Sequence, residues 1–335
     1  MKPKTDILKR KSDHIDVVLD QARNQTETNN PFDRYQLVPD ALPECDLKTF
    51  PLATEFLGRK LKLPFLISSM TGGPLRAKRI NLHLAEAAQE LGIALAIGSQ
   101  RVALLDEGAC GLTCEIRDHA PNVPIYSNLG ASQIRDDFSL DDVKRAVEMI
   151  RADALIIHLN PMQEALQEHG DTDWTGIEAS IERLCHDLDL PIIVKEVGMG
   201  ISASVAQRLS NIGVSAVDVA GNGGTNFIMV EGARSSDPTI SGLAETFKDW
   251  GLATPEAIIR IRESCPEIPL IASGGIRNGL DAAKALRLGA DLVAQAGPVL
   301  AAACDSSTAV VEHFEFMAKC TRLALACSEK SLLTT

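Results

Sequence analysis

The chain has 335 residues and carries 33 Lys and Arg against 45 Asp and Glu, which gives a formal net charge of −12. This acidic balance argues against non-specific binding to nucleic acid or to anionic lipid, because both require a positive protein face. No apolar run reaches the roughly 18 to 20 residues of a membrane span, and the charged N-terminus lacks the apolar core of a secretory signal. We expect a cytoplasmic protein that binds neither nucleic acid nor membrane.

Short apolar runs alternate with amphipathic stretches of helical period from residue 61 onward, a pattern typical of repeated β-α units. Eight strands are predicted, at residues 63–70, 94–99, 124–129, 154–160, 191–197, 216–221, 269–274 and 292–297. Helices are predicted at residues 76–91, 140–150, 177–188, 204–212, 255–264 and 280–288. A further amphipathic stretch at 310–326 is either the closing helix or an interface.

The apolar character of these runs is continuous, which suits parallel strands that are covered on both faces. Eight such strands close into a TIM (β/α)8 barrel, the α/β architecture that we predict for residues 61–335, with residues 1–60 as an N-terminal extension. The rival is a doubly wound open sheet, but its usual Gly-x-Gly-x-x-Gly signal is missing after the first strand. In a TIM barrel the chemistry lies at the C-terminal ends of the strands.

Polar or small residues that an apolar core would not favour stand at the end of each predicted strand. They are Ser69, Met70 and Thr71; Ser99 and Gln100; Asn128; His158 and Asn160; Lys195 and Glu196; Asp218; Ser273; and Gln295. A single histidine at such a place is more often structural than functional. A complete ring of polar strand ends instead predicts a site at the barrel mouth.

Three glycine-rich turns follow predicted strands, at residues 70–73, 220–224 and 273–279. Glycine allows unusual backbone dihedrals and lets N–H groups approach a phosphate oxygen closely. The last of these turns, together with the Ala-Gly-Pro at 296–298, occupies the place where many barrels bind phosphate. The alternative is that the glycines serve tight turns only.

Three charged features near the predicted mouth each allow two interpretations. Lys195 would present a cation to a ligand, or it would pair with Glu196, although neighbouring strand residues face opposite ways. Glu164, a carboxylate among neutral donors, suits Mg²⁺, or it simply opens a solvated helix. For the basic cluster at residues 9–11, composition favours a solvated tail, and the alternative is a segment that reaches over the mouth to hold a diphosphate.

Motifs along nearly the whole chain resemble one family, the flavin-dependent type 2 isopentenyl diphosphate isomerases. The matching segments are RKSDH, SSMTGG, GSQR, SNLGA, HLNPMQE, VKEVGMG, DVAGNGGTNF, SGGIRNGLDAAKALRLGA and AGP. The resemblance implies an isomerase of isoprenoid biosynthesis that interconverts isopentenyl and dimethylallyl diphosphate. It further implies bound FMN, Mg²⁺, NADPH or NADH as the flavin reductant, and a homotetramer or homo-octamer.

The resemblance also assigns residues to the ligands. The FMN contacts that it implies are Ser69, Met70, Thr71, Ser99, Asn128, Lys195, Thr225, Gly275, Ile276, Arg277, Ala296 and Gly297. The substrate contacts are Arg10, Lys11, Arg101, His158, Asn160 and Gln163, and the metal ligand is Glu164. Two positions depart from the family: Ala220 stands where serine is frequent, and Glu168 and His169 precede Gly170 where a proline is usual.

The isomerisation adds a proton at one carbon and removes one from another, and the resemblance assigns this shuttle to reduced flavin, with His158 and Lys195 as candidate assistants. An enzymatic rival is an FMN oxidase or dehydrogenase of 2-hydroxy acids, which should show a His and an Arg around the glycines of the sixth strand. Residues 219–225 contain neither. A flavin-binding protein without catalysis is a rival of another class.

Overall fold

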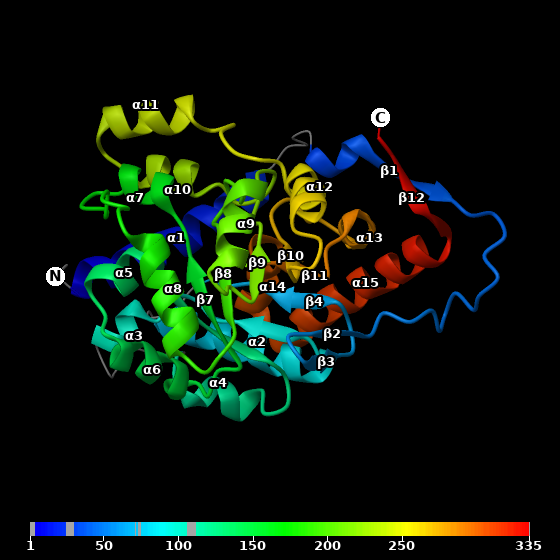
Figure 1. Ribbon diagram of the computed structural model, residues 1–335, viewed down its shortest axis with the longest axis horizontal. Coiled ribbons are helices and arrows are strands. Elements are labelled where there is room, and N and C mark those ends of the chain that lie inside the picture. Colours follow the sequence, from blue (N-terminus) through cyan, green and yellow to red (C-terminus); the bar gives the residue numbers. More distant parts are fainter. Residues whose placement is uncertain (1–3, 25–29, 71, 73–74, 106–111, 335) are drawn as a thin grey trace.

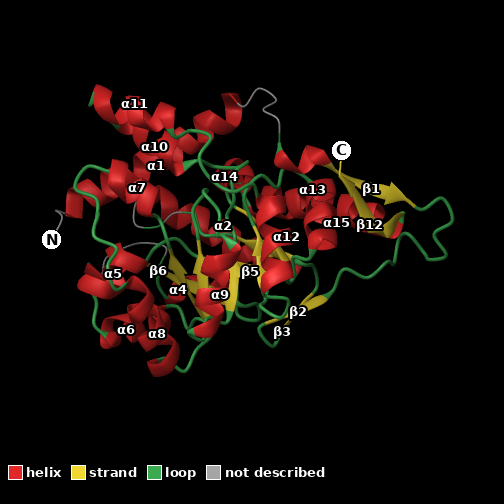
Figure 2. Ribbon diagram, turned by 45° about the horizontal axis from the view of Figure 1, so that its top comes forward, coloured by secondary structure: helices red, strands yellow, loops and turns green. Residues whose placement is uncertain are grey.

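The computed structural model describes residues 4–24, 30–70, 72, 75–105 and 112–334 (Figures 1 and 2). The strands are β1 Tyr35–Pro39, β2 Thr54–Phe56, β3 Arg59–Leu61, β4 Phe65–Ile67, β5 Ala94–Ala96, β6 Ile125–Gly130, β7 Ala154–His158, β8 Ile192–Lys195, β9 Ala216–Asp218, β10 Leu270–Ala272, β11 Leu292–Gln295 and β12 Ser328–Thr334. The helices are α1 Lys4–Asn24, the short 3-10 helix η1 Pro31–Arg34, α2 Leu75–Leu91, α3 Arg101–Leu105, α4 Cys114–His119, α5 Ala131–Asp136, α6 Leu140–Met149, α7 Pro161–Leu166, α8 Ile177–Asp187, α9 Ala203–Asn211, α10 Phe227–Arg234, α11 Pro238–Thr246, α12 Thr254–Ser264, α13 Gly279–Leu288, α14 Gly297–Asp305 and α15 Ser307–Ala326.

Strands β4 to β11 pair in parallel and close into a barrel, with β11 pairing back onto β4. Helices surround this barrel, and the antiparallel pair of β1 and β12 projects from one end of the molecule (Figure 1). The TIM-barrel prediction is therefore confirmed. Each predicted strand is present, but most are shorter than predicted, because the residues at their C-terminal ends leave the hydrogen-bonded ladder and form the loops of the mouth.

The six predicted barrel helices are present, with bounds that differ by about one residue from those expected. Within the described residues, further helices have no counterpart in the prediction: α1, α3, α4, α5, α7, α10, α11 and α14. Most of these are too short to show a helical period. Helix α1 is long, but charges dominate its sequence, and the buried residues Ile15 and Leu19 define only a narrow apolar stripe.

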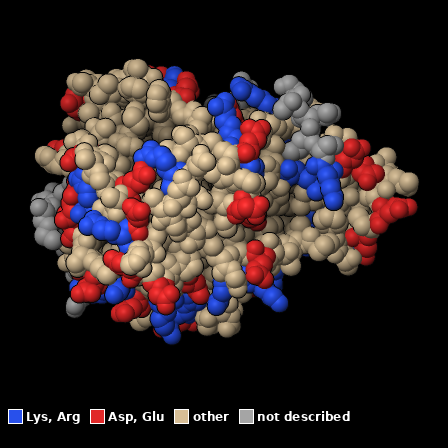
Figure 3. All heavy atoms as spheres, viewed as in Figure 1, with Lys and Arg blue, Asp and Glu red and all other residues tan. Residues whose placement is uncertain are grey.

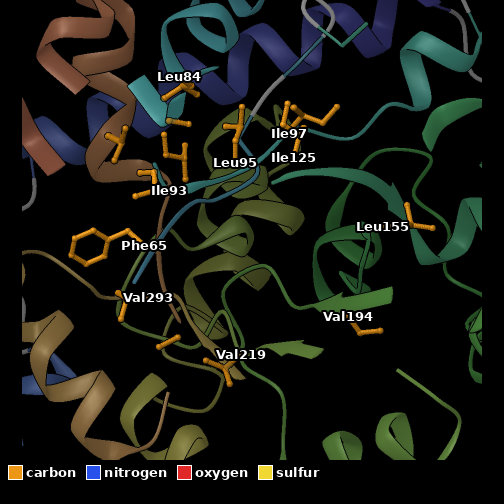
Figure 4. Close-up of a cluster of buried hydrophobic side chains, with 14 of the residues drawn as sticks. Phe65, Leu84, Ile93, Leu95, Ile97, Ile125, Leu155, Val194, Val219 and Val293 are labelled. Atoms are coloured by element: carbon orange, nitrogen blue, oxygen red, sulfur yellow. The ribbon is translucent and has the colours of Figure 1, made fainter. Parts of the chain in front are cut away.

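Two buried layers alternate along the barrel strands with the period of two that a strand imposes. Phe65, Leu95 and Val293 belong to the layer between strands and helices, and Figure 4 shows them within this cluster. Their neighbours Leu66 and Ala94 belong to a separate cluster that fills the barrel interior. The β2–β3 hairpin joins this interior cluster through its own apolar side chains, so it covers the end of the barrel opposite the mouth.

The long C-terminal helix α15 packs against α2, α13 and α14, with Val310, Phe314 and Met317 buried. It is therefore the closing helix of the barrel, although Phe316 and Leu323 on its outer side remain exposed. Acidic and basic side chains are interspersed over most of the face drawn in Figure 3. Among the described residues, none of the helices combines the length and the apolar character needed to span a bilayer.

Candidate active site

A cavity of about 620 Å³ opens at the C-terminal ends of the barrel strands. Its floor continues the interior face of the barrel, where on most strands an apolar residue gives way to a polar one two positions further along. Ser68 follows Leu66 in this way, and Lys195 follows Ile193. Interior side chains deep in the barrel pack against one another, whereas those at the mouth face a space large enough for a ligand.

The structure brings the predicted site residues that it describes to this one cavity. They are Arg10, Lys11, Ser69, Met70, Ser99, Arg101, Asn128, His158, Asn160, Gln163, Glu164, Lys195, Thr225, Gly275, Ile276, Arg277, Ala296 and Gly297. Thr71 lies outside the described residues. Segments separated by almost 290 positions in the sequence thus line one space, which none of them could form alone.

Three cations line one side of the cavity. Arg10 and Lys11 come from α1, and Arg101 is the first residue of α3. The Lys11 ammonium donates to the Ser99 carbonyl at 2.8 Å, and Arg101 pairs with Asp137 at 2.8 Å. Burial, with the charges of Arg10 and Arg101, lowers the pKa of Lys11 to about 7. Three cationic side chains at one cavity can offer charge-assisted hydrogen bonds to an anionic ligand.

Arg10 and Lys11 thus do not belong to a solvated tail, in contrast to what composition favoured for this cluster. Burial lowers the pKa of Arg10 against the opposing pull of Glu164 and Glu231. The Nε atoms of Arg10 and Arg101 are buried and have no hydrogen-bond partner among the described residues. Unsatisfied buried donors are costly, so their position beside a cavity is typical of a ligand site.

Glu231 of α10 anchors α1 above the cavity, and no motif analysis pointed to it. Its Oε1 accepts from Gln163 Nε2 at 3.0 Å and lies 3.0 Å from His14 Nε2, while its Oε2 accepts from Arg234 at 2.7 Å. Although burial opposes ionisation, these donors and charges hold the pKa of Glu231 at about 2. His14 follows Arg10 by four residues, the spacing of one helical face, and this signal could have identified it.

Glu164 lies in α7, buried, with its carboxylate held by three protein donors. Asn160 Nδ2 donates to it at 3.1 Å, Gln167 Nε2 at 3.2 Å and the Asp171 amide at 2.9 Å. The following loop packs tightly, since a Cβ on Gly170 would collide with the Glu164 carbonyl oxygen. His169 in this loop has a positive φ of 57°.

His158 and Asn128 stand side by side on the cavity floor. His158 Nδ1 lies 3.0 Å from the side-chain Oδ1 of Asn128, so Nδ1 carries the proton and Nε2 is left as an acceptor. Burial, together with the charges of Lys195, Lys11 and Arg10, lowers the pKa of His158 to about 4. The imidazole is therefore neutral at physiological pH and serves as a hydrogen-bonding group.

Lys195 pairs with Asp218 on the neighbouring strand, at 3.3 Å, and lies 3.4 Å from Ser273 Oγ. Asp218 is fully buried and accepts from Ser273 at 2.5 Å. The alternative pairing with Glu196 is wrong, because that side chain turns to the other face of the strand. There its Oε2 accepts from the backbone amides of residues 197–200.

The turn after β10 contacts the turn after β9, backbone to backbone. Gly274 and Gly275 have φ values of 91° and 75°, which residues with a side chain rarely adopt. A Cβ on Gly274 would collide with the Gly221 carbonyl oxygen, and one on Gly224 would lie 2.7 Å from the Gly275 nitrogen. The glycines are therefore required by contact between the turns as well as by dihedral angle. Ala220 also has a positive φ, 39°.

Further residues of the cavity wall were missed by sequence reasoning: Ser68, Gln133, Gln167 and Phe227. Ser68 has a sequence signal, because it lies two positions after the interior residue Leu66. Its buried hydroxyl has no hydrogen-bond partner among the described residues. The others have no such signal, since they reach the cavity from loops and helices whose placement depends on the assembled barrel.

The model of the FMN-dependent dehydrogenase family matches residues 4–110 and 128–328. The chain is also similar to solved structures of an active mutant of (S)-mandelate dehydrogenase, with a TM-score of 0.68, 16% identity and 99% coverage of both chains. A crystal structure of mandelate oxidase gives a TM-score of 0.60 with 18% identity, covering 97% of this chain and 94% of that one. At this identity the structural likeness concerns the fold alone.

Curated relatives are much more similar in sequence. The isopentenyl-diphosphate delta-isomerase of Xanthobacter autotrophicus is 54% identical, over 94% of this chain and 92% of that protein. Those of Stutzerimonas stutzeri and Synechocystis sp. are 52% and 45% identical, each over 97% of this chain and 94% and 93% of the relative. The chain therefore belongs to the isopentenyl-diphosphate delta-isomerase family, in the type that shares the FMN-dependent dehydrogenase barrel.

Proposed function

We propose that this chain is an isopentenyl-diphosphate delta-isomerase that interconverts isopentenyl and dimethylallyl diphosphate with reduced FMN and Mg²⁺. The observation that carries the proposal is the division of one cavity into two anion-binding ends. The buried cations Arg10, Lys11 and Arg101 form one end, and the glycine turn at 274–277 forms the other. One end suits a diphosphate and the other the phosphate of a flavin nucleotide.

The cavity fits FMN by the character of its polar groups. The Ser68 hydroxyl is buried without a partner among the described residues, and the amides of Gly275 and Ile276 likewise have no acceptor there. Lys195, Asn128 and the residues 296–297 line the same part of the cavity. We propose that these groups, with Ser69, Met70, Ser99, Thr225 and Arg277, hold FMN.

Glu164 fits a magnesium ion that is shared with the substrate. Three donors occupy part of its carboxylate, which has about four lone-pair sites, so a position remains for a cation. The described residues contain no group of three or more His, Cys, Asp or Glu that could hold a metal by itself. Mg²⁺ commonly uses one or two protein carboxylates together with water and substrate phosphate, and this arrangement matches that use.

When bound, reduced flavin supplies the group that gives and takes the proton during isomerisation. The protein's own residues orient the substrate and stabilise its charge. We assign diphosphate binding to Arg10, Lys11 and Arg101, and assign His158, Asn160 and Gln163 to the lining of the substrate site. Neutral His158 offers only an acceptor at Nε2, so it does not act as a cationic acid at neutral pH.

Further parts of the proposal rest on the family resemblance. They are NADPH or NADH as the flavin reductant, a homotetramer or homo-octamer, and a cytoplasmic location. The role of residues 1–60 as an extension that contributes substrate contacts is supported by α1, which lines the cavity with Arg10 and Lys11. The 2-hydroxy-acid oxidase alternative is disfavoured because residues 219–225 supply neither His nor Arg to the cavity.

The test is anaerobic turnover of isopentenyl diphosphate by the purified protein with FMN, Mg²⁺ and NADPH, each omitted in turn. We expect dimethylallyl diphosphate only when all three are present. Full turnover without reductant would contradict the reduced-flavin mechanism. FMN binding with no isomer formed would leave a flavin-binding barrel and overturn the isomerase proposal.

Two variants separate the metal role from the flavin role. Glu164→Gln should retain FMN and lose Mg²⁺-dependent turnover by about 100-fold or more, because the amide cannot supply the anionic ligand. Lys195→Ala should instead weaken FMN binding, measured by flavin fluorescence, and leave Asp218 as a buried carboxylate without its cation. An unchanged Mg²⁺ response in Glu164→Gln would remove the metal assignment.

A further inference from the structure

We propose that Asn30 and Asp33 are positioning residues for the flavin phosphate: together they fix the glycine turn at 274–277 so that its amides stay available to the ligand. The proposal rests on the proposed function, in that FMN occupies the cavity. Asn30 and η1, residues 30–34, form what we call the anchor segment. It is remote in sequence from the barrel mouth, and none of the phosphate-binding motifs includes it.

Asn30 sets the orientation of one peptide plane in the turn. Its buried side chain donates from Nδ2 to the Gly275 carbonyl at 2.7 Å, while its Oδ1 accepts from the Phe32 amide at 2.9 Å. In the trans peptide between Gly275 and Ile276, the carbonyl and the N–H point in opposite directions. By holding the carbonyl on its own side, Asn30 turns the Ile276 amide away from itself, and this amide has no acceptor among the described residues.

Asp33 forms an ion pair with the guanidinium of Arg277, a residue that the resemblance assigned to FMN binding. Arg277 Nη2 donates to Asp33 Oδ1 at 2.5 Å and Nη1 to Oδ2 at 3.3 Å. From the other side Asp281 accepts from Arg277 Nε at 2.8 Å and from Nη2 at 3.1 Å. Two carboxylates thus satisfy this one cation, whose side chain is 44% exposed. Arg277 therefore links the turn to the anchor segment while it also lines the cavity.

The rest of the anchor segment is fixed to the same part of the barrel. Phe32 is fully buried, and its carbonyl accepts from the buried Lys284 of α13 at 2.9 Å. Pro31 packs on Gly223, where an added Cβ would lie 2.8 Å from the proline ring. The anchor segment therefore contacts the glycine turns after β9 and after β10. Packing of Pro31 and Phe32 holds it in place, and Asn30 and Asp33 then act on the turn at 274–277.

This arrangement makes phosphate recognition depend on oriented amides and not on net charge. A dianionic phosphate binds more tightly to amides that are already aligned, because no conformational entropy is lost in ordering them on binding. The isoalloxazine ring, in contrast, would be held by other parts of the cavity. Loss of the anchor contacts should therefore weaken FMN, which carries the phosphate, much more than riboflavin, which lacks it.

The experiment measures dissociation constants of FMN and riboflavin by flavin fluorescence for the full chain and for variants. Asn30→Asp keeps an oxygen for the Phe32 amide but replaces the donor to Gly275, and Asp33→Asn removes the charge that holds Arg277. The matched controls are Asn122→Asp and Asp40→Asn, the same chemical changes at positions outside the anchor segment and the cavity. Asp33→Glu tests rescue by a longer carboxylate, and circular dichroism with thermal unfolding checks the fold.

We expect FMN affinity to fall about tenfold or more in Asn30→Asp and Asp33→Asn, with riboflavin affinity changed by less than about threefold. Both controls should match the parent chain, and Asp33→Glu should recover most of the preference for FMN. Equal losses of FMN and riboflavin, or retained preference in both variants, would overturn the inference and leave the proposed function standing. A parent chain that binds FMN no better than riboflavin would overturn the flavin assignment and the inference together.

Discussion

The two anion-binding ends of the cavity are built in opposite ways. At the α1 end, three cations lie close together, and burial, with the charges of Arg10 and Arg101, lowers the pKa of Lys11 to about 7. At the glycine end, Arg277 is paired with Asp33 and Asp281, and the amides of Gly275 and Ile276 have no acceptor among the described residues. In the proposed function, one end would bind the diphosphate through charged side chains, and the other would bind the flavin phosphate through oriented amides.

The largest effect should come from the glycine end, where geometry leaves no space. Gly274→Ala adds a Cβ at a φ of 91° directly against the Gly221 carbonyl oxygen. We expect the free energy of unfolding, measured with urea, to fall by about 3 kcal/mol or more, together with loss of FMN binding. Gly58→Ala is the matched control, because Gly58 has a φ of 73° but open space around its Cβ position, and it should cost about 1 kcal/mol. An equal loss of unfolding free energy in the two variants would show that the positive φ alone causes the destabilisation.

The next effect concerns the cation end. Arg10→Ala should weaken binding of inorganic pyrophosphate by about 30- to 100-fold, because a charge-assisted contact of about 2 to 3 kcal/mol is lost. FMN affinity should change by less than about twofold. Isothermal titration of both ligands checks this, with Arg260→Ala, an exposed arginine of α12, as the control. A larger effect on FMN than on pyrophosphate would reverse the assignment of the two ends.

The smallest effect is a pH dependence of the cation end. Because the pKa of Lys11 is lowered to about 7, the side chain is charged below pH 7 and increasingly neutral above it. A bound anion favours the charged form, so pyrophosphate binding should take up close to one proton at pH 8 through Lys11 and almost none at pH 6. Affinity should correspondingly weaken by up to about tenfold per pH unit above pH 7.

Calorimetry in buffers of different ionisation enthalpy measures this uptake. The variant Lys11→Met is the control, since subtracting its proton balance removes the titration of pyrophosphate itself. The difference between the parent chain and Lys11→Met should therefore be close to one proton at pH 8. No difference at pH 8 would mean that Lys11 is not the titrating group of the cation end.

Much of the barrel and its mouth followed from the sequence. Continuous apolar runs predicted eight parallel strands, and polar residues at their ends, such as Asn128 and Lys195, predicted which side chains face the mouth. Strand alternation makes this inference strong, because a residue two positions beyond an interior Leu or Ile must face the same way. The same rule would have found Ser68.

The sequence could not predict which side chains on different strands and helices interact with one another. Asp218 as the partner of Lys195, and Glu231 as the anchor of α1, depend on which strands and helices become neighbours. The charged sequence of α1 showed too narrow an apolar stripe to distinguish a buried helix from a solvated tail, and its burial depends on a surface that exists only after the barrel has closed.

The sequence by itself determined the eight strands, the glycines with their special dihedrals and the residue types of the mouth, because these follow from local chain geometry and from the burial of apolar surface. Tertiary structure alone decided that Arg10 and Lys11 meet Arg101, and that Asn30 and Asp33 hold the turn at 274–277. Charges and hydrogen bonds act over a few ångströms, and only the closed barrel brings residues so distant in the chain within that range.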